Sequence, residues 1–308
     1  MTNRLTIADW LVHGGHQYEF FKSDHNFLCT KPDGSAPVYA ELGRPENKNV
    51  TYVTRQVLQS AVFDLVIVRT GVQSKLYESL KMSDGFRGIA VMQTVTPFKV
   101  SDKVKTLVWN SKVTMDKYKK NFVGKKHFFI PHGFDPSEFN NLSLNRNNRI
   151  LNVSSIFKDR NIFLGYDDWS WVSNKSKVCD LIGHGNEKIP GCIGTFPLHE
   201  LVRKYNEYGV YLNTTNASAM PRSRAEALMC GTPIITTNNY GISEFLKDGR
   251  DCIFADNKRD MLKSCNDVLS NNSLSKDLSF YGRESAIKHF HIDDYLSKWE
   301  EVFYEAMK

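Results

Sequence analysis

The chain has 308 residues, of which 41% are hydrophobic and 24% charged, proportions that are ordinary for a globular protein with room for two domains. No apolar run is long enough to cross a bilayer, and the N-terminal residues lack the features of a signal peptide. We therefore expect a cytoplasmic protein, in the host cytoplasm if viral, that is soluble or bound peripherally to a membrane. The six cysteines form no Cys-x-x-Cys pair, which favours free thiols over zinc ligands or disulfides.

The net charge of +6 is unevenly distributed. Residues 1–137 hold 19 Lys and Arg against 12 Asp and Glu (+7), whereas residues 138–308 hold 21 against 22 (−1). Much of the excess lies in residues 99–126, where lysines are interleaved with Trp109, Tyr118 and Phe122. Such a run is typical of a solvated helix face, or of a surface for a polyanion such as nucleic acid or an anionic membrane.

Strand-like and helix-like segments alternate along the chain, which predicts an α/β fold with mostly parallel sheets. In the first half, the predicted strands are residues 5–12, 25–30, 63–69, 88–93, 106–110 and 127–130. The predicted helices are residues 17–22, 54–61, 74–81 and 112–122.

The polar stretch 135–149 is the best candidate for a linker between two domains. Beyond it, the predicted strands are residues 150–153, 177–182, 191–193, 210–213, 234–237 and 251–254. The predicted helices are residues 198–206, 223–230, 242–246, 259–269 and 277–289. We expect domains at 1–137 and 138–290, followed by an amphipathic helix at 291–308.

Residues 218–246 read as a phosphate-binding helix start that leads into a buried strand. Pro221 suits the first turn of a helix, Gly231 its C-terminal cap, and Pro233 prevents its continuation. The free N–H groups of such a helix attract an anion, and Glu226, one turn inside, could accept hydrogen bonds from sugar or ribose hydroxyls. An ordinary βαβ crossover has the same pattern.

This segment resembles the donor site of GT-B glycosyltransferases, in particular the large retaining family with a Glu-x7-Glu signature followed by Ala-x-x-x-Gly-x-Pro. Four further segments are similar to parts of that family: residues 130–135, 150–160, 181–185 and 241–246. The resemblance implies two Rossmann-like domains that face each other across a cleft. The first, 1–137, is expected to bind the acceptor and the second, 138–290, the nucleotide sugar, and the helix at 291–308 is expected to cross back to the first domain. Glu226 matches the second Glu of the signature, whereas Ser218 stands where the first is expected.

The resemblance also implies site residues. For the donor these are Gly14, Gly15, Gly183, Gly185, Ser218, Ala219, Met220, Arg222 and Glu226. Lys158 and Arg160 follow a predicted strand, where two cations could neutralise a diphosphate leaving group, so we expect catalytic roles for Lys158, Arg160 and Glu226. The candidates on the acceptor side are His13, His16, Gln93 and Thr94.

No His-x-His or Asp-x-Asp cluster stands out, and we expect neither a metal nor another cofactor. The adjacent Asp167 and Asp168 fit the start of a surface helix better than a metal site.

The expected function is transfer of a sugar from a nucleoside diphosphate sugar, most simply a UDP-sugar, to a hydroxyl group, with retention implied by the resemblance. The basic first half points to a polyanionic acceptor. We expect hydroxymethylated bases in DNA, turned out of the duplex, ahead of a lipid-linked or cell-surface glycan at an anionic membrane. A nucleotide-sugar epimerase and a binding protein without catalysis are further alternatives.

Overall fold

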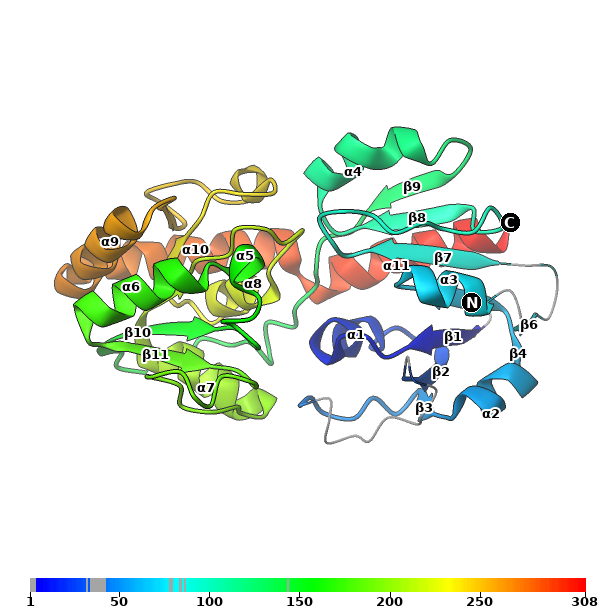
Figure 1. The fold of residues 1–308 in the computed structure, drawn as a ribbon, viewed down its shortest axis with the longest axis horizontal. Helices are drawn as coiled ribbons and strands as arrows, with labels where there is room; N and C mark the ends of the chain where they lie inside the picture. Colours follow the sequence, from blue (N-terminus) through cyan, green and yellow to red (C-terminus); the bar gives the residue numbers. More distant parts are fainter. Residues whose placement is uncertain are drawn as a thin grey trace. The chain divides into compact units, whose positions relative to one another are not determined.

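The computed structural model describes residues 4–31, 33, 43–77, 80–82, 85, 87–142 and 144–308. The chain divides into two compact units (Figure 1). Unit 1 comprises Met1–Gly133 together with Ile292–Lys308, and unit 2 comprises Phe134–His291. Among the described residues, no helix combines the length and apolar composition that are needed to cross a membrane.

Unit 1 is built on a parallel sheet with the strand order β3-β2-β1-β5-β7-β8-β9. Its strands are β1 Thr6–Trp10, β2 Asn26–Thr30, β3 Val50–Tyr52, β5 Leu65–Val68, β7 Gly88–Met92, β8 Thr106–Trp109 and β9 Lys126–Phe129. A separate pair joins β4 Val62–Phe63 to β6 Lys81–Met82. The predicted strands of this half are confirmed. The sequence analysis missed β3, β4 and β6, because two or three residues are too few to show an alternating pattern.

The helices of unit 1 are α1 Gly14–Phe20, α2 Arg55–Ser60, α3 Gly71–Leu76, α4 Lys112–Tyr118 and α11 Ile292–Met307. The 3-10 turn Lys119–Asn121 follows α4. Two predicted starts were wrong. Helix α1 already begins at Gly14, because the His13 side chain caps it by accepting the N–H of His16. Helix α3 begins at Gly71, where Thr70 and Gln73 form a capping box.

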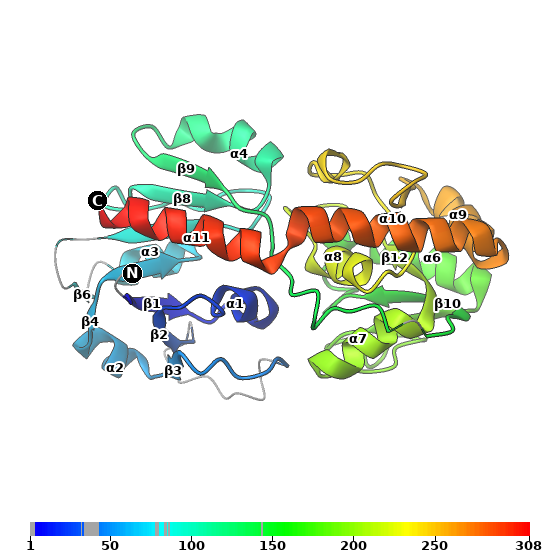
Figure 2. The ribbon, with the colours of Figure 1, turned by 180° about the vertical axis from the view of Figure 1, so that it is seen from behind.

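Alternate residues of the unit 1 strands face two different cores. Ile7, Leu65 and Ile89 pack with α1 and α11 on one face, and Ala8 and Val66 pack on the other face against α2 and the α4 region. Figure 2 shows α11 lying along the first of these faces. The apolar face predicted for the C-terminal helix therefore packs in the core of unit 1.

Unit 2 has a five-stranded parallel sheet with the order β11-β10-β12-β13-β14. Its strands are β10 Asn147–Val153, β11 Cys179–Ile182, β12 Tyr208–Asn213, β13 Ile234–Thr236 and β14 Ile253–Phe254. The strand predicted at 191–193 was wrong, because Cys192 makes only an isolated bridge to Leu181.

The helices of unit 2 are α5 Asn161–Leu164, α6 Tyr166–Ser176, α7 Leu198–Glu207, α8 Arg222–Met229, α9 Lys258–Ser270 and α10 Asn272–Phe290. Residues 242–246, predicted as a helix, contain only the 3-10 turn Ile242–Glu244. Helices α6 and α9 cover one face of the sheet, and α7 and α8 cover the other, where α10 packs on α8 (Figure 1). Asp167 and Asp168 lie in the first turn of α6, as predicted. All six cysteines are free, as predicted.

The packing of α11 gives a stability prediction. Trp299 is 1% exposed, and its ring lies 4.7 Å from that of Phe20 in α1. Replacing Trp299 with Ala should lower the free energy of unfolding by about 3–5 kcal/mol, because the cavity would open in the centre of this core. Urea unfolding followed by far-UV circular dichroism measures the change.

The matched control is Tyr304→Ala on the same helix, where the side chain is 59% exposed. This variant should unfold close to the wild type. Equal destabilisation by the two variants would contradict the assignment of the Trp299 face to the core.

Candidate functional site

The loops after the unit 2 strands meet at one edge of the sheet, because parallel strands end on the same side. This edge carries most of the donor-site residues that the sequence predicted. Ser154 to Arg160 follow β10, Gly183 and Gly185 follow β11, and Ser218 to Met220 lie between β12 and α8. We call it the C-terminal edge of unit 2.

The loops after β10 and β11 are tied together by the buried side chain of Asn186. Its amide nitrogen donates to the carbonyls of Ser154 (2.6 Å) and Gly183 (2.9 Å), and its oxygen accepts the Phe157 N–H at 2.8 Å. Gly183 has φ +142°, and a Cβ there would lie 2.2 Å from the Ser154 carbonyl oxygen. Glycine is therefore required at this close approach. Lys158 and Arg160, beyond this anchored turn, are exposed.

Backbone strain marks two of these loops. Ile156 after β10 has φ +51°, and Tyr240 after β13 has φ +47°. A β-branched residue in this region is a real outlier, since its side chain clashes with its own backbone. Strained residues of this kind cluster at ligand-binding sites.

The loops after β12 and β13 are joined by a second polar network. The Thr237 hydroxyl and the Asn239 amide both donate to the Thr215 carbonyl. Arg224 in α8 donates from Nη2 to the side-chain oxygens of Asn213 (3.1 Å) and Asn239 (3.2 Å). Hydrogen bonds from the loop after β13 and from α8 thus hold residues 213–215, which lead to Ser218.

Helix α8 begins at this edge without a side-chain cap, since its N-cap residue is Pro221. The side chain of Pro221 therefore accepts no hydrogen bond from the first N–H groups of the helix. Of the predicted donor residues that precede it, Ala219 is buried, and Ser218 and Met220 are partly buried. The arrangement is suited to an anion at the helix N-terminus.

Glu226 is 3% exposed, one turn inside α8. Its carboxylate accepts a hydrogen bond from the Tyr205 hydroxyl at 3.1 Å and pairs with Arg222 at 3.4 Å. Burial and the nearby Glu226 charge raise the pKa of Tyr205, so Tyr205 stays a donor. Arg222 also lies over the Phe134 ring, 4.5 Å from its centre. These contacts fix Glu226 in place within unit 2.

The predicted acceptor-side residues belong to unit 1, where the structure brings two of them together. The Gln93 amide nitrogen lies 3.3 Å from His16 Nδ1. Arg69 Nη1 is also 3.3 Å from that nitrogen, and since a guanidinium can only donate, Nδ1 is the acceptor.

Arg69 is itself held by Asp9 through three hydrogen bonds, of which the shortest run from Nε to Oδ1 at 2.9 Å and from Nη2 to Oδ2 at 2.7 Å. Both side chains are fully buried, and Gln17 adds a bond to Asp9 at 2.9 Å. A buried bidentate pair of this kind orients the guanidinium rigidly. It fixes the position of His16.

The other predicted residues of unit 1 have local roles. His13 caps α1, Gly14 and Gly15 form its first turn, and Thr94 is exposed with its hydroxyl bonded to the Thr96 carbonyl.

Asp9, Arg69, Asn186 and Arg224 were not predicted from the sequence as site residues. Asp9 stands within an apolar strand, and a charge in that setting signals a buried partner. The partner lies sixty residues away along the chain, and no pattern in the sequence specifies it.

No group of three or more His, Cys, Asp or Glu side chains suited to a metal ion occurs in the part of the chain that the structure describes. Asp167, the first residue of the acidic pair, instead accepts a hydrogen bond from the Asn161 amide at 2.6 Å.

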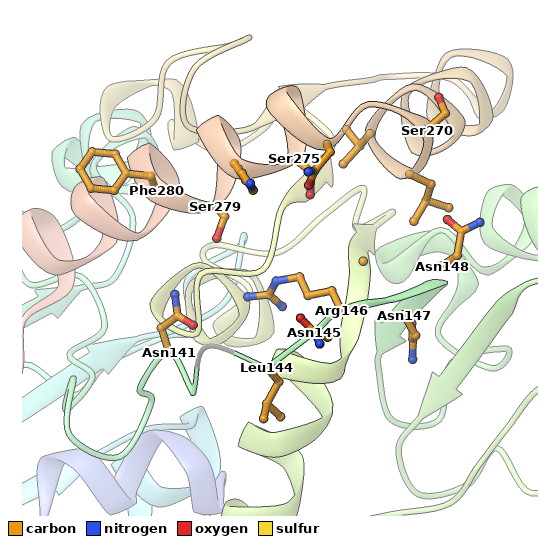
Figure 3. A pocket seen from close by; sticks show the side chains of 15 residues that line it. Asn141, Leu144, Asn145, Arg146, Asn147, Asn148, Ser270, Ser275, Ser279 and Phe280 are labelled. Atoms are coloured by element: carbon orange, nitrogen blue, oxygen red, sulfur yellow. The ribbon is translucent and has the colours of Figure 1, made fainter.

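A cavity of about 720 Å³ lies at the other edge of the unit 2 sheet, where β10 begins (Figure 3). Asparagines of the segment 141–148 and serines of α10 line it. Arg146 also lines the cavity, but its guanidinium donates hydrogen bonds to backbone carbonyls, among them that of Gly231 at 2.8 Å. The cavity therefore lies away from the loops that carry the predicted donor residues.

Residues 178–301 match the family model described as glycosyl transferase-like, a range that includes α8 and the glycine turn after β11. No curated protein sequence matches the chain.

Solved structures share the fold at low sequence identity. HepE from Anabaena, solved with UDP and glucose, has a TM-score of 0.74 at 11% identity and covers 98% of this chain and 100% of its own. A glycosyltransferase from Rickettsia africae has a TM-score of 0.69 at 15% identity, with 99% of each chain covered. TarM from S. aureus has a TM-score of 0.60 at 13% identity, with 78% of this chain covered. This chain spans 55% of TarM. The protein therefore has the GT-B fold of two Rossmann-like domains, and residues 178–301 match the glycosyl transferase-like family.

Proposed function

We propose that the protein is a glycosyltransferase that moves a sugar from a UDP-sugar to a hydroxyl acceptor with retention of configuration. One observation carries this proposal. The cationic loop after β10, the glycine turn after β11 and the uncapped start of α8 converge at the C-terminal edge of unit 2. The family match covers two of these three elements, and HepE was solved with UDP.

The chemistry of the reaction explains why these groups are needed. As the bond from the sugar to the diphosphate breaks, negative charge builds on the phosphate oxygens. Lys158 and Arg160 are exposed and could neutralise that charge, together with the first N–H groups of α8. In a front-face retaining reaction, the leaving phosphate itself accepts the proton of the acceptor hydroxyl. The protein then needs no strong base.

The ribose and the sugar have candidate partners next to the phosphates. We assign Glu226 to the ribose hydroxyls, since Arg222 and Tyr205 hold its carboxylate in one position. Ser218, Ala219 and Met220 would present backbone amides to the sugar and phosphates. Ser218 supplies a hydroxyl where the similar family has a carboxylate. We therefore expect the choice of donor sugar to differ from that family.

The acceptor is assigned from unit 1. In the lysine run of residues 99–126, Trp109 is fully buried and Phe122 packs on it with ring centres 5.9 Å apart. Trp109 therefore cannot stack on nucleic acid bases, and Phe122 is only partly exposed. Lys125 donates to the carbonyls of Ser101 and Val104, and Lys126 pairs with Glu305 at 2.7 Å. We therefore propose a glycan or lipid-linked glycan acceptor ahead of DNA.

Loss of Arg160 tests the donor site. Arg160→Ala should weaken UDP binding about ten- to a hundredfold, since one charge-assisted hydrogen bond is worth roughly 1.5–3 kcal/mol. Thermal stability should not change, because the side chain is exposed. Isothermal titration calorimetry with UDP measures the affinity. The control is Lys276→Ala, another exposed cation, which lines the cavity at the opposite edge of the sheet. If the two variants bind UDP with equal affinity, the assignment of Arg160 to the donor site is wrong.

A chelator tests the role of the two cations. If Lys158 and Arg160 neutralise the diphosphate, sugar transfer should continue at an unchanged rate in excess EDTA. Release of UDP from UDP-sugar in the presence of acceptor gives the rate. Activity that disappears with EDTA and returns with manganese or magnesium would show that a metal does this work instead.

An acceptor panel tests the reaction itself. UDP-sugars are incubated with glycan, lipid-linked glycan and hydroxymethylated DNA acceptors, and free UDP and products are separated by chromatography. Release of UDP only with a glycan acceptor is the expected result. Transfer to DNA, with strongly salt-dependent DNA binding, would reverse the choice of acceptor. An isomerised UDP-sugar would indicate an epimerase, and binding without turnover would indicate a protein that has lost catalysis.

A further inference from the structure

Two arginines lie at opposite ends of α8, Arg146 partly buried and Arg224 buried. Arg146 lies at the C-terminal end, where Nη2 donates to the carbonyls of Cys230 (3.1 Å) and Gly231 (2.8 Å). Its Nη1 donates to the Tyr205 carbonyl at 2.9 Å (Figure 3 shows the side chain). Carbonyls at a helix C-terminus carry partial negative charge, so a cation is stabilised there. These bonds to backbone carbonyls give Arg146 a structural role.

Arg224 lies in the first turn of the same helix, where the partial charge is positive and a cation is not stabilised. It is 2% exposed, and its hydrogen-bond acceptors are the side-chain oxygens of Asn213 and Asn239. Within the described part of the chain, its Nε has no hydrogen-bond partner and no carboxylate pairs with it. Burial lowers the pKa of Arg224 to about 10. The N-terminus of a helix carries partial positive charge, which adds to the cost of a cation in this place.

A carboxylate is present on the same helix, but a different arginine uses it. Glu226 pairs with Arg222, four residues earlier, at 3.4 Å. Arg222 gains in addition from the Phe134 ring. The sequence Arg222-Ser-Arg-Ala-Glu226 therefore gives a counter-charge to its first arginine and none to its second.

We propose that Arg224 is a positioning residue whose counter-ion is the diphosphate of the bound ligand. The inference rests on the proposed function, since it assigns a further residue to the same donor site. The guanidinium does not touch the ligand. Its fixed charge adds to that of the helix N-terminus, and its bonds to the two asparagines order the loops that meet the ligand.

The path from Arg224 to the ligand loop is short. Arg224 holds the oxygen of Asn239, and the nitrogen of that amide donates to the carbonyls of Thr215 and Asn216. Asn216 leads directly to Ser218, where the proposed donor amides begin. A buried charge is also weakly screened by water and salt, so it acts on an anion at this edge more strongly than a surface lysine would.

The test compares Arg224→Met with Arg146→Met, which remove the same group from the two ends of α8. Thermal melting without ligand and calorimetric titration with UDP are measured for both. For R224M we expect a melting temperature close to that of the wild type, because relief of the uncompensated buried charge offsets the hydrogen bonds that Asn213 and Asn239 lose. UDP affinity should fall at least about tenfold. R146M should melt lower, and its folded fraction should bind UDP like the wild type.

A second variant and a second probe separate the outcomes. Arg224→Lys keeps the charge and should retain part of the UDP affinity that R224M loses. Wild-type UDP affinity in R224M would overturn the inference and leave the proposed function intact. Destabilisation of R224M to the extent of R146M, or failure to fold, would show a purely structural role and would also overturn it. If the wild type does not bind UDP, the proposed function fails, and inorganic pyrophosphate becomes the probe. If pyrophosphate then raises the melting temperature of the wild type but not that of R224M, the result supports the inference. If it raises neither melting temperature, the result overturns the inference.

Discussion

Asparagine side chains that bridge neighbouring loops are the interaction on which the C-terminal edge of unit 2 depends. Asn186 joins the loop after β10 to the loop after β11, and Asn239 joins the loop after β13 to the loop after β12. Each amide donates and accepts at the same time, so it fixes both loops in one geometry. Because the strands are parallel, every loop held in this way ends on the same side of the sheet. The edge can therefore present cations, glycine backbone and helix N–H groups to one ligand.

Charge is distributed along α8 in keeping with that role. The helix dipole favours the cation at its C-terminal end, where Arg146 contacts carbonyls, and opposes the one at its start. Arg222 and Glu226 neutralise each other, which leaves the first turn with the net positive charge of Arg224. The buried charge of Arg224 itself costs stability, because no carboxylate in the described part of the chain compensates it. Stability and the proposed function thus place opposite demands on one side chain.

The sequence predicted most of the fold, because the β-branched strands and the helix signals at Pro221 and Gly231 are local features. It located the start of α8 to within one residue and the glycine turn at Gly183. It placed His16 and Gln93 as separate candidates, and their contact depends on which strands are neighbours in the sheet. The start of α1 was wrong because a Gly-Gly pair predicts a turn, whereas the His13 cap allows both glycines to be helical. Asn186 and Arg224 were missed, since a polar residue acquires its role only from distant partners.

The central claim is that the C-terminal edge of unit 2 binds the nucleoside diphosphate of the donor. A crystal structure with UDP tests it most directly. The account predicts density for the diphosphate against the first turn of α8 and within hydrogen-bonding distance of Lys158 or Arg160, with the ribose near Glu226. UDP bound instead in the cavity between residues 141–148 and α10, with the C-terminal edge unchanged, would contradict it.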